Sequence, residues 1–576
     1  MRIKRVKIHN YRNLDGAEVF FADDCNFIVG ENNLGKSNLL SLFNIIFSRR
    51  SFDNEDFADE AQPIEIHLRL KLADIEIGHF GDLFDVEDHT VINLVCRQLS
   101  TDEFIEFSHL ETETNIQSSL VRSLNYAHYD SLRNPIAEIN FDKGRGVGRF
   151  LNNLLCQYLR DSNMVDEDFL VEEKVAALIK AINDKLLKIK SFKDFGILAM
   201  ADDDLETLLS KVLILKDRKG DALTKAGYGI QFFVLVTLSF LDRIQSIMLH
   251  HRDRGVFEDE KTGKKALSLV LGFDEPEIHL HPYMQRSLLK YLNSIINNEN
   301  QDFRILLKDL FDIDSVIGQI IVVTQSPNII LNDFRQIIRF YSGTDSIKII
   351  SGTQLKLDSQ LIKHLYLNFP FIKEAFFSRC AIFVEGDSEY SSLPLFAQKL
   401  TMPVDFDDLG ICVIQAHGQA IPQLITLASS YGIPSVGMTD RDSGITPSRQ
   451  GHYQTNFRNF EEELVSIVDT GGEGTLRSIV QQYDPQGINA VVQSGALNKW
   501  AVEKYSVVST KFTNNLRLAD IPATDAATLK AFYLTWFSLN KSYPLGRSIG
   551  EALSEKEIPS PYKTLISEAL KLAQNV

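Results

Sequence analysis

The first residues suited to chemistry form a loop between two apolar segments. The stretch FIVGENNLGKSNLLSLF, residues 27–43, fits the pattern G-x-x-x-x-G-K-[ST]. Two glycines let the backbone curl so that its N–H groups point at phosphate oxygens. The lysine then reaches the β- and γ-phosphates, and the serine hydroxyl ligates Mg²⁺. A surface turn before a helix is the alternative. The candidates for binding ATP and its Mg²⁺ are Gly30, Asn33, Gly35, Lys36 and Ser37.

A pair of acidic residues follows a second apolar segment. The run Leu269 to Phe273 indicates a buried strand. Asp274 at its end can complete the Mg²⁺ shell, and Glu275 can polarise the attacking water. Upstream, Gly227 and Gly229 precede an apolar helix. Such a helix start can receive the γ-phosphate of a nucleotide bound to another subunit, although a plain capping loop is an equal alternative.

A second group of carboxylates follows two short apolar segments. Glu385 and Glu389 come after residues 381–384, and Asp440 and Asp442 come after residues 435–438. Because parallel strands end at one edge of a sheet, these four side chains are expected to converge there. Clustered carboxylates repel one another unless a cation lies between them, and hard oxygen ligands favour Mg²⁺ or Mn²⁺. An ordinary flavodoxin-like domain with acidic loops is the alternative.

The elements that must position these residues belong to a long α/β chain. Its 576 residues predict three or four domains. The start of the sequence has no signal-peptide pattern and alternates basic and apolar residues, as in a half-exposed strand. The longest apolar run, Ile230 to Leu241, ends at Asp242 and is interpreted as a buried helix too short to span a bilayer.

Charge and cysteine content narrow the functional classes. The net charge is −17, which argues against a nonspecific polycation, but a local groove can still bind nucleic acid. The 5 cysteines are widely separated without a C-x-x-C pair, so neither a zinc site nor a disulfide framework is expected. A reducing cytoplasm is the simplest setting.

The nucleotide-binding motifs resemble those of one ATPase family. The opening segment with its loop, the Gly-x-Gly sequence and FDEPEIHLHP are similar to the ATP-binding-cassette ATPases of chromosome maintenance and recombination repair. The resemblance implies an ATPase head formed by residues 1–140 and 215–355. Two such heads, one from each of two chains, would sandwich ATP between them. Residues 141–214 show helical spacing and are expected to be a small helical insertion that pairs two chains.

One position departs from that family. The sequence IIVVTQSPNII places Gln325 where the family usually carries histidine. Glutamine can donate to a γ-phosphate or orient a water, but it cannot carry charge. Slow hydrolysis of ATP is therefore expected.

The order E-G-x-x-E followed by D-x-D resembles the Toprim fold of topoisomerases and primases. A cassette ATPase followed by a Toprim domain, here residues 375–576, is similar to the overcoming-lysogenization-defect (OLD) nucleases. The short insertion favours the two-metal class that includes the Gabija nuclease subunit and some retron effectors. This resemblance implies a metal role for Glu461, with Glu463 as its rival, and a charge-stabilising role for Lys541.

The expected function is ATP-regulated cutting of DNA as an anti-phage effector. Metal ligands would be Glu385, Glu389, Asp440, Asp442 and Glu461, with Lys541 stabilising charge on the scissile phosphate. Partners would be DNA, a second copy joined through heads and insertion, and an operon partner such as a helicase or a reverse transcriptase; no membrane is expected. The alternatives are a repair or DNA-end clamp with a non-cleaving Toprim module, and the ATPase subunit of a larger defence complex.

Overall fold

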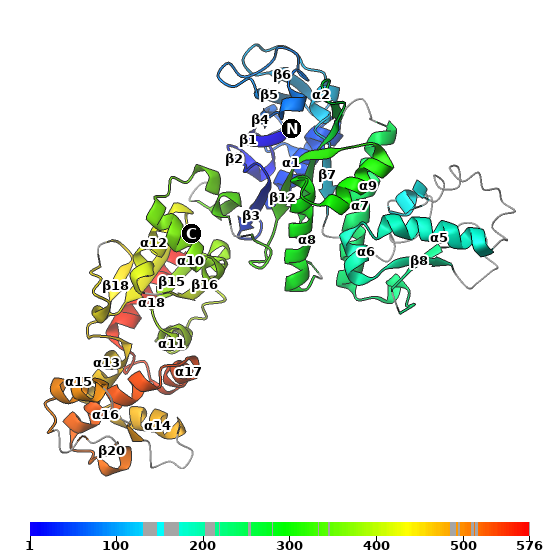
Figure 1. The fold of residues 1–576 in the computed structure, drawn as a ribbon. Coiled ribbons are helices and arrows are strands. Elements are labelled where there is room, and N and C mark those ends of the chain that lie inside the picture. The colour runs from blue at the N-terminus through cyan, green and yellow to red at the C-terminus, as the bar shows by residue number, and fades with distance from the viewer. Residues whose placement is uncertain are drawn as a thin grey trace. The chain divides into compact units, whose positions relative to one another are not determined.

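The computed structural model divides the chain into two compact units, which are described separately (Figure 1). The first comprises Met1–Tyr341 with Asp345–Gln354, and the second comprises Ser342–Thr344 with Leu355–Val576. The structure describes residues 1–130, 147–151, 153–154, 172–201, 213–217, 219–250, 255–278, 280–331, 333–343, 346–416, 418–447, 449–483, 491–492, 496–508, 512 and 516–574.

A seven-stranded sheet forms the centre of the first unit, in the order β10-β11-β12-β3-β13-β14 with β7 also paired to β11. Its inner strands β11, β12, β3 and β13 run parallel. All of β3 and eight successive residues of β11 are buried, as expected for parallel strands covered on both faces. The strands are β3 (Cys25–Gly30), β7 (Tyr126–Tyr129), β10 (Val256–Glu258), β11 (Lys265–Asp274), β12 (Ser315–Val323), β13 (Ile337–Ser342) and β14 (Ile347–Ser351).

The first unit also contains a five-stranded antiparallel sheet, in the order β2-β1-β4-β5-β6. Buried and part-exposed residues alternate strictly along β4, so one face of this sheet packs on the core. Its strands are β1 (Arg2–His9), β2 (Glu18–Phe20), β4 (Ile64–Lys71), β5 (Val91–Gln98) and β6 (Glu106–His109). The helices of the unit's core are α1 (Lys36–Ser48), α2 (Ser118–Arg122), α7 (Tyr228–His250), α8 (Pro282–Ile296) and α9 (Gln301–Phe311).

Helix α7 is longer than the sequence predicted. It continues past Asp242 to His250, and the charged residues at that point have partners. Arg149 donates to both carboxylate oxygens of Asp242, at 3.1 and 2.9 Å, and Arg243 donates to the Tyr126 carbonyl at 3.2 Å. The segment Gly229–Leu249 is long and apolar enough to cross a membrane, but 67% of its apolar window is buried, as in the core helix of a folded domain.

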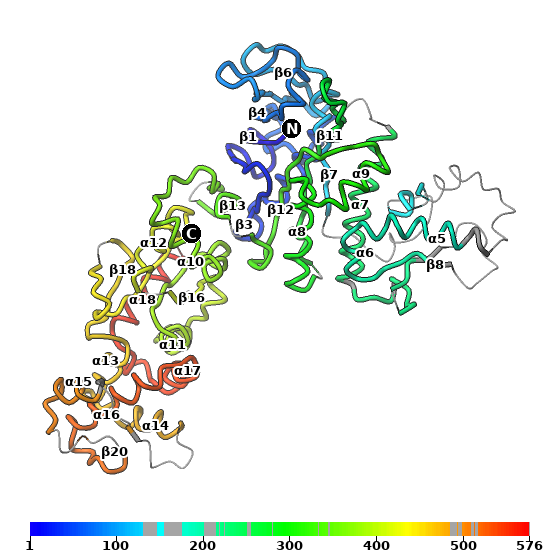
Figure 2. The backbone as a smooth tube through the Cα atoms, in the orientation of Figure 1, coloured from blue at the N-terminus to red at the C-terminus, as the bar shows by residue number. Residues whose placement is uncertain are grey.

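The segment expected to be a helical insertion contains helices and also a pair of strands. Its described elements are α5 (Glu172–Leu186), α6 (Lys190–Phe195), β8 (Leu198–Ala201) and β9 (Leu213–Lys216). The two strands pair antiparallel, a hairpin that helical spacing did not predict. These elements lie to one side of α7, and α6 packs against it (Figure 2). Residues 155–171 and 202–212 lie outside the described part.

The second unit is built on a four-stranded parallel sheet in the order β16-β15-β17-β18. Successive residues of β15 pack on opposite sides: Ile382 joins the core containing α11 and α18, whereas Phe383 faces α12. Because helices cover both faces, the strands read as short continuous apolar runs. The elements are α10 (Ser359–Ile372), β15 (Cys380–Val384), α11 (Asp387–Gln398), β16 (Ile411–Gln415), α12 (Ile421–Ser430), β17 (Ser435–Thr439), β18 (His452–Gln454) and α18 (Ser560–Gln574).

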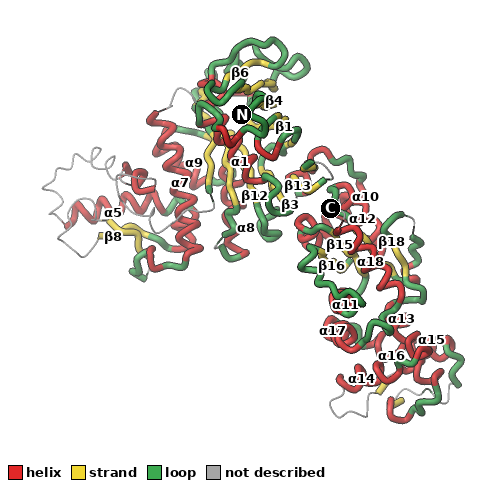
Figure 3. Tube along the Cα trace, turned by 180° about the vertical axis from the view of Figure 1, so that it is seen from behind, coloured by secondary structure: helices red, strands yellow, loops and turns green. Residues whose placement is uncertain are grey.

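Between β18 and α18 the described chain is mainly helical (Figure 3). Helix α16 lies at the centre of this part and contacts both α13 and α15. The elements are α13 (Phe460–Val465), α14 (Glu473–Tyr483), β19 (Val491–Val492), α15 (Ala496–Lys504), β20 (Leu516–Arg517), α16 (Ala526–Leu539) and α17 (Tyr543–Ala552). The four described cysteines of the chain, Cys25, Cys96, Cys380 and Cys412, are buried and unpaired with one another.

Candidate functional site

The glycine loop joins β3 to α1 in a conformation that requires glycine. Gly30 has φ 125°, and a Cβ there would lie 1.9 Å from the Phe340 carbonyl oxygen. Gly35 has φ 79° and caps α1, which begins at Lys36. The Lys36 ammonium donates to the Gly30 carbonyl at 2.9 Å and to that of Glu31, so it closes the loop from inside. Asn33, in the same loop, has a left-handed backbone with φ 64°.

The acidic strand end of β11 meets this loop. Ser37 Oγ donates to Asp274 Oδ1 at 3.0 Å, although 237 residues separate them. Burial raises the pKa of Asp274, and the Ser37 hydrogen bond only partly offsets this. Burial also lowers the pKa of Lys36, despite the opposing effect of Glu275 and Asp274. A hydroxyl, a carboxylate and an ammonium therefore lie together, which is the set that a nucleotide phosphate with its Mg²⁺ requires.

Gln325 lies at the end of β12, beside the acidic pair. Its amide Nε2 donates to Glu275 Oε1. The residue predicted to polarise water is therefore in contact with Gln325, the residue that differs from the usual histidine of the ATPase family. Glu275 has φ 46°, an uncommon left-handed backbone for a residue with a side chain. The structure thus brings Lys36, Ser37, Asp274, Glu275 and Gln325 into one site.

Sequence reasoning missed Glu277. Its carboxylate oxygen accepts hydrogen bonds from Thr324 Oγ1 at 2.7 Å, Gln325 N at 2.6 Å and Ser326 N at 3.1 Å. Burial raises the pKa of Glu277, although these hydrogen bonds oppose it. Glu277 therefore ties the end of β12 to the end of β11 and fixes the position of Gln325. The donors are 47 to 49 residues away, so no local pattern signals this role.

The glycines Gly227 and Gly229 lie at the start of α7. A Cβ on Gly227 would meet nothing within 4 Å, so the helix start is open on that side. Contact with a nucleotide on a second subunit stays a prediction.

The second candidate site lies at one edge of the four-stranded sheet. Glu385 follows β15, and its Oε2 accepts the backbone N–H of Asp440, which follows β17, at 3.2 Å. Two glycines leave room for the carboxylates. A Cβ on Gly418 would lie 2.3 Å from Glu385 Oε2, and a Cβ on Gly386 would lie 2.3 Å from Glu389 Oε2.

The electrostatics of this edge are those of crowded buried acids. Glu389 is 4% exposed and Asp440 is 8% exposed. Burial raises the pKa of Glu389, and the neighbouring Glu461 raises it further. Burial likewise raises the pKa of Asp440, and Glu389, Glu461 and Glu385 add to the effect. Neighbouring carboxylates raise the pKa of both Glu389 and Asp440, so these acids repel one another; that they share a cation stays a prediction.

Lys541 provides a positive charge beside the acids. Its Nζ lies 2.7 Å from Glu461 Oε2, and Glu461 is almost fully buried. Burial lowers the pKa of Lys541, but Glu461, Glu389 and Asp440 outweigh it and keep that pKa above its ordinary value. The rival Glu463 instead accepts the Phe457 backbone N–H at 2.8 Å. Of the two glutamates, it is Glu461 that contacts Lys541.

Asp442 differs from the other predicted ligands. It is partly exposed, and its Oδ2 accepts from Arg458 Nε at 2.9 Å. Among the described residues, no group of three or more His, Cys, Asp or Glu side chains is arranged to hold a metal ion. In the described chain these acids lie near one another but are not arranged as a complete set of metal ligands.

The donor set nevertheless fits a divalent cation. Asp440 Oδ1 is buried and has no hydrogen-bond partner within the described chain, and its neighbours are carboxylate oxygens. A buried anionic oxygen without a donor is costly unless a cation or a proton meets it. Hard oxygen ligands of this kind suit Mg²⁺ or Mn²⁺.

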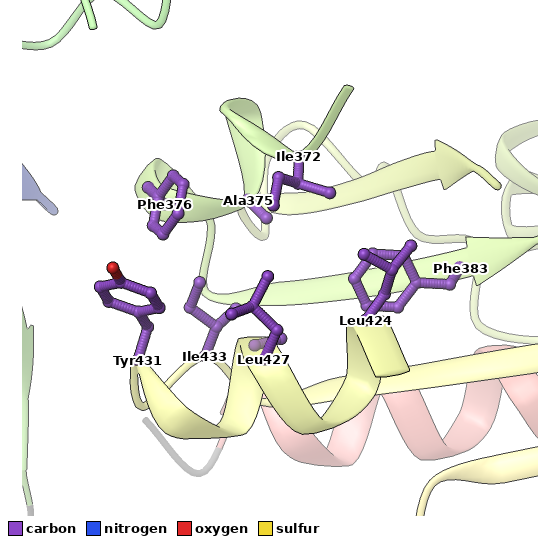
Figure 4. Close-up of a pocket in the computed structure, with 9 residues that line it drawn as sticks. Ile372, Ala375, Phe376, Phe383, Leu424, Leu427, Tyr431 and Ile433 are labelled. Carbon is purple, nitrogen blue, oxygen red and sulfur yellow. The ribbon is translucent and has the colours of Figure 1, made fainter. Parts of the chain in front are cut away.

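An apolar pocket of the second unit has a different character (Figure 4). It lies between α12 and the segment before β15 and is lined by Phe376, Phe383, Leu427 and Tyr431, among others. The described residues that line it include no charged side chain.

Comparison with known families yields two matches. The AAA ATPase domain family matches residues 1–195 and 147–330, and the overcoming-lysogenization-defect protein-like Toprim domain matches residues 376–442. They confirm the predicted fold class, an α/β ATPase head followed by a Toprim domain.

Similar proteins include two that are described as DNA replication and repair protein RecF. The one from Thermoanaerobacter sp. (strain X514) is 23% identical over 328 residues, which are 53% of this chain and 75% of that protein. The one from Oceanobacillus iheyensis is 41% identical over 51 residues, 9% of this chain and 14% of that protein.

Two solved structures are also similar. The Smc head bound to the C-winged helix domain of ScpA has a TM-score of 0.36 at 14% identity, covering 63% of this chain and 100% of that one. The C-terminal region of the Xanthomonas campestris pv. campestris OLD protein has a TM-score of 0.25 at 18% identity, covering 35% of this chain and 96% of that one.

Proposed function

Because the chain belongs to the OLD family, in which an AAA ATPase domain precedes a Toprim domain, we propose that it is an ATP-regulated, divalent-metal-dependent DNA endonuclease. The two domains support ATP-dependent processing of nucleic acid. The observation that carries the finer proposal is the group of buried carboxylates at one sheet edge, with the Lys541 ammonium 2.7 Å from Glu461. Buried acids beside a fixed positive charge suit hydrolysis of a phosphodiester better than simple binding of a polyanion.

The residues of this edge divide the work of the reaction. Glu385, Glu389 and Asp440 would hold the cation, which supplies an activated water and support for the leaving oxygen when bound. Glu385 also accepts the Asp440 backbone N–H, and this fixes one ligand relative to another. Lys541 places a positive charge where the phosphate gains negative charge, and Glu461 holds its ammonium in place.

ATP would act by binding to the first unit and changing the arrangement of the protein, without a need for repeated hydrolysis. Lys36, Ser37 and Asp274 would hold the phosphates and Mg²⁺. The contact between Gln325 and Glu275 places a neutral amide where the family usually has histidine, which favours binding over turnover. Occupied heads of two copies would then pair, and the pairing would control cutting.

The proposal is tested by nicking of supercoiled plasmid with Mg²⁺ or Mn²⁺. The parent protein should nick, and Asp440→Asn should fall to background because the central oxygen donor loses its charge. Asp469→Asn is the matched control: Asp469 is 62% exposed and pairs only with Lys530 among the described ion pairs, so this variant should nick like the parent. Parental nicking by Asp440→Asn would reject the site.

A second candidate is favoured by the relation to RecF over 53% of the chain. In it, the protein is an ATPase clamp on DNA ends and the Toprim domain only binds. Cation-dependent nicking that is lost in Asp440→Asn decides for the nuclease; ATP-dependent DNA binding without nicking decides for the clamp.

The proposal also covers the compartment and the biological role of the protein. We place the protein in the cytoplasm, in keeping with four buried, unpaired cysteines in the described chain. Within that setting it would act against phage, alone or with a helicase or reverse transcriptase. Plaque counts on cells carrying the parent or Asp440→Asn test this role.

A further inference from the structure

One predicted metal ligand is already paired with a cation of the protein itself. Asp442 Oδ2 accepts from Arg458 Nε at 2.9 Å, and the Asp442 backbone N–H donates to the Arg458 carbonyl at 3.0 Å. The two residues are therefore held together by side chain and backbone. Both side chains are partly exposed, at 35% for Asp442 and 43% for Arg458.

The Arg458 guanidinium also lies over an aromatic ring. The Arg458 guanidinium carbon lies 4.3 Å from the centre of the Trp500 ring in α15. An ion pair also joins α15 to α13, which begins two residues after Arg458, since Lys504 Nζ lies 2.9 Å from Glu462 Oε1. Stacking on an indole attracts a guanidinium independently of any carboxylate. Arg458 therefore has a position to occupy when it is not bound to Asp442.

The two aspartates of the D-x-D sequence are thus in opposite states. Asp440 presents a buried oxygen without a hydrogen-bond partner in the described chain, whereas Asp442 is neutralised by an arginine. A divalent cation and a guanidinium repel one another and compete for the same carboxylate oxygen. The Asp442 oxygen that accepts from Arg458 is therefore available to a cation only when the arginine moves away.

We propose that Arg458 is a positioning residue that occupies Asp442 until a divalent cation binds and displaces it, while Trp500 retains the guanidinium at the edge of the site. The ligand is a hard divalent cation, and the inference rests on the proposed nuclease function. Binding of the cation thereby exchanges an internal ion pair for a metal–carboxylate contact.

The exchange has a spectroscopic signature because the chain has only 2 tryptophans. Titration of Mg²⁺ into the full-length protein, followed by calorimetry and tryptophan fluorescence, should give binding and a coincident change in emission. Trp500→Phe should bind Mg²⁺ but lose the change, which leaves Trp536, 6% exposed, as the remaining tryptophan. Asp440→Asn should lose both signals.

The direction in which Mg²⁺ affinity changes when Arg458 is removed tests the proposed displacement most directly. Arg458→Ala should bind Mg²⁺ about two- to fivefold more tightly, the range that corresponds to a partly exposed ion pair, and its fluorescence should no longer respond. Arg547→Ala is the control, because it removes an equal charge from an exposed ion pair with Glu551 and should leave affinity unchanged.

The possible results separate the two proposals. Mg²⁺ binding with unchanged fluorescence, or weaker binding by Arg458→Ala, overturns the displacement of Arg458 and leaves the nuclease proposal standing. Absence of Mg²⁺ binding to the second unit of the parent, seen as heat unaffected by Asp440→Asn, overturns both.

Discussion

At the scale of single residues, the candidate nuclease site depends on two glycines, which have no side chain in the space beside its carboxylates. The carboxylates of Glu385 and Glu389 have room where they lie because Gly418 and Gly386 have no side chain in that space. A methyl group at either position would stand 2.3 Å from a carboxylate oxygen. The site is therefore shaped by backbone as much as by acids, and a small substitution tests it without removing any charge.

We expect Gly418→Ala to reduce plasmid nicking roughly a hundredfold, because displacement of a reacting group by about 1 Å has that effect on catalysis. Its thermal unfolding should stay close to that of the parent, since the clash falls on a side chain. Gly474→Ala in α14 is the matched control, as its Cβ would meet nothing within 4 Å. Equal nicking by the two variants would show that Glu385 has no fixed role.

At the scale of elements, apolar periodicity and motif spacing located most of the positioning strands. The strand before the glycine loop and the strand before Asp274 are β3 and β11, and the two short apolar segments of the second unit are β15 and β17. Gln325, Asp274 and Ser37 meet because β11, β12 and β3 are adjacent. Adjacency of parallel strands follows from the fold class, so the sequence was sufficient for these positions.

The sequence was insufficient where a partner comes from a distant element. The apolar run that predicted this helix ends at Asp242, whereas α7 continues to His250 and Asp242 pairs with Arg149. Glu277 and Arg458 were assigned no role, because their contacts are with residues at the end of β12 and in α15. The pairing of Asp442 with Arg458 was likewise not predicted, although Asp442 still lies near enough to Glu461 to raise the pKa of that carboxyl.

Helix α18 shows how a distant element completes the second unit. It lies more than one hundred residues after β17 yet packs on β15, β17 and β18. We expect Leu565→Ala, at a fully buried position of this helix, to lower the free energy of unfolding by roughly 2–5 kcal/mol. Chemical denaturation measures the loss. Ser567→Ala, on the exposed side of the same helix, should change it by less than about 0.5 kcal/mol. Similar values for both variants would contradict the assignment of α18 to the core.

At the scale of the whole molecule, the proposal joins two sites that lie in separate compact units. One would bind a nucleotide through Lys36, Ser37 and Asp274, and the other carries the acids of the sheet edge. If ATP acts by occupancy, its effect must depend on the first site alone and must not require hydrolysis. Loss of the nucleotide should then leave the chemistry of the second unit intact but unregulated.

The most direct test measures plasmid nicking by the parent and by Lys36→Ala, each without nucleotide, with ATP and with a non-hydrolysable ATP analogue. Lys36 supplies the charge that holds the β- and γ-phosphates, so the variant should not bind nucleotide. We predict that ATP and the analogue change the parent's rate in the same direction and to a similar extent, and that Lys36→Ala nicks at one rate in all three conditions. A parent that ignores nucleotide, an analogue without effect, or a variant that still responds to ATP would contradict the central claim that occupancy of this loop controls cutting.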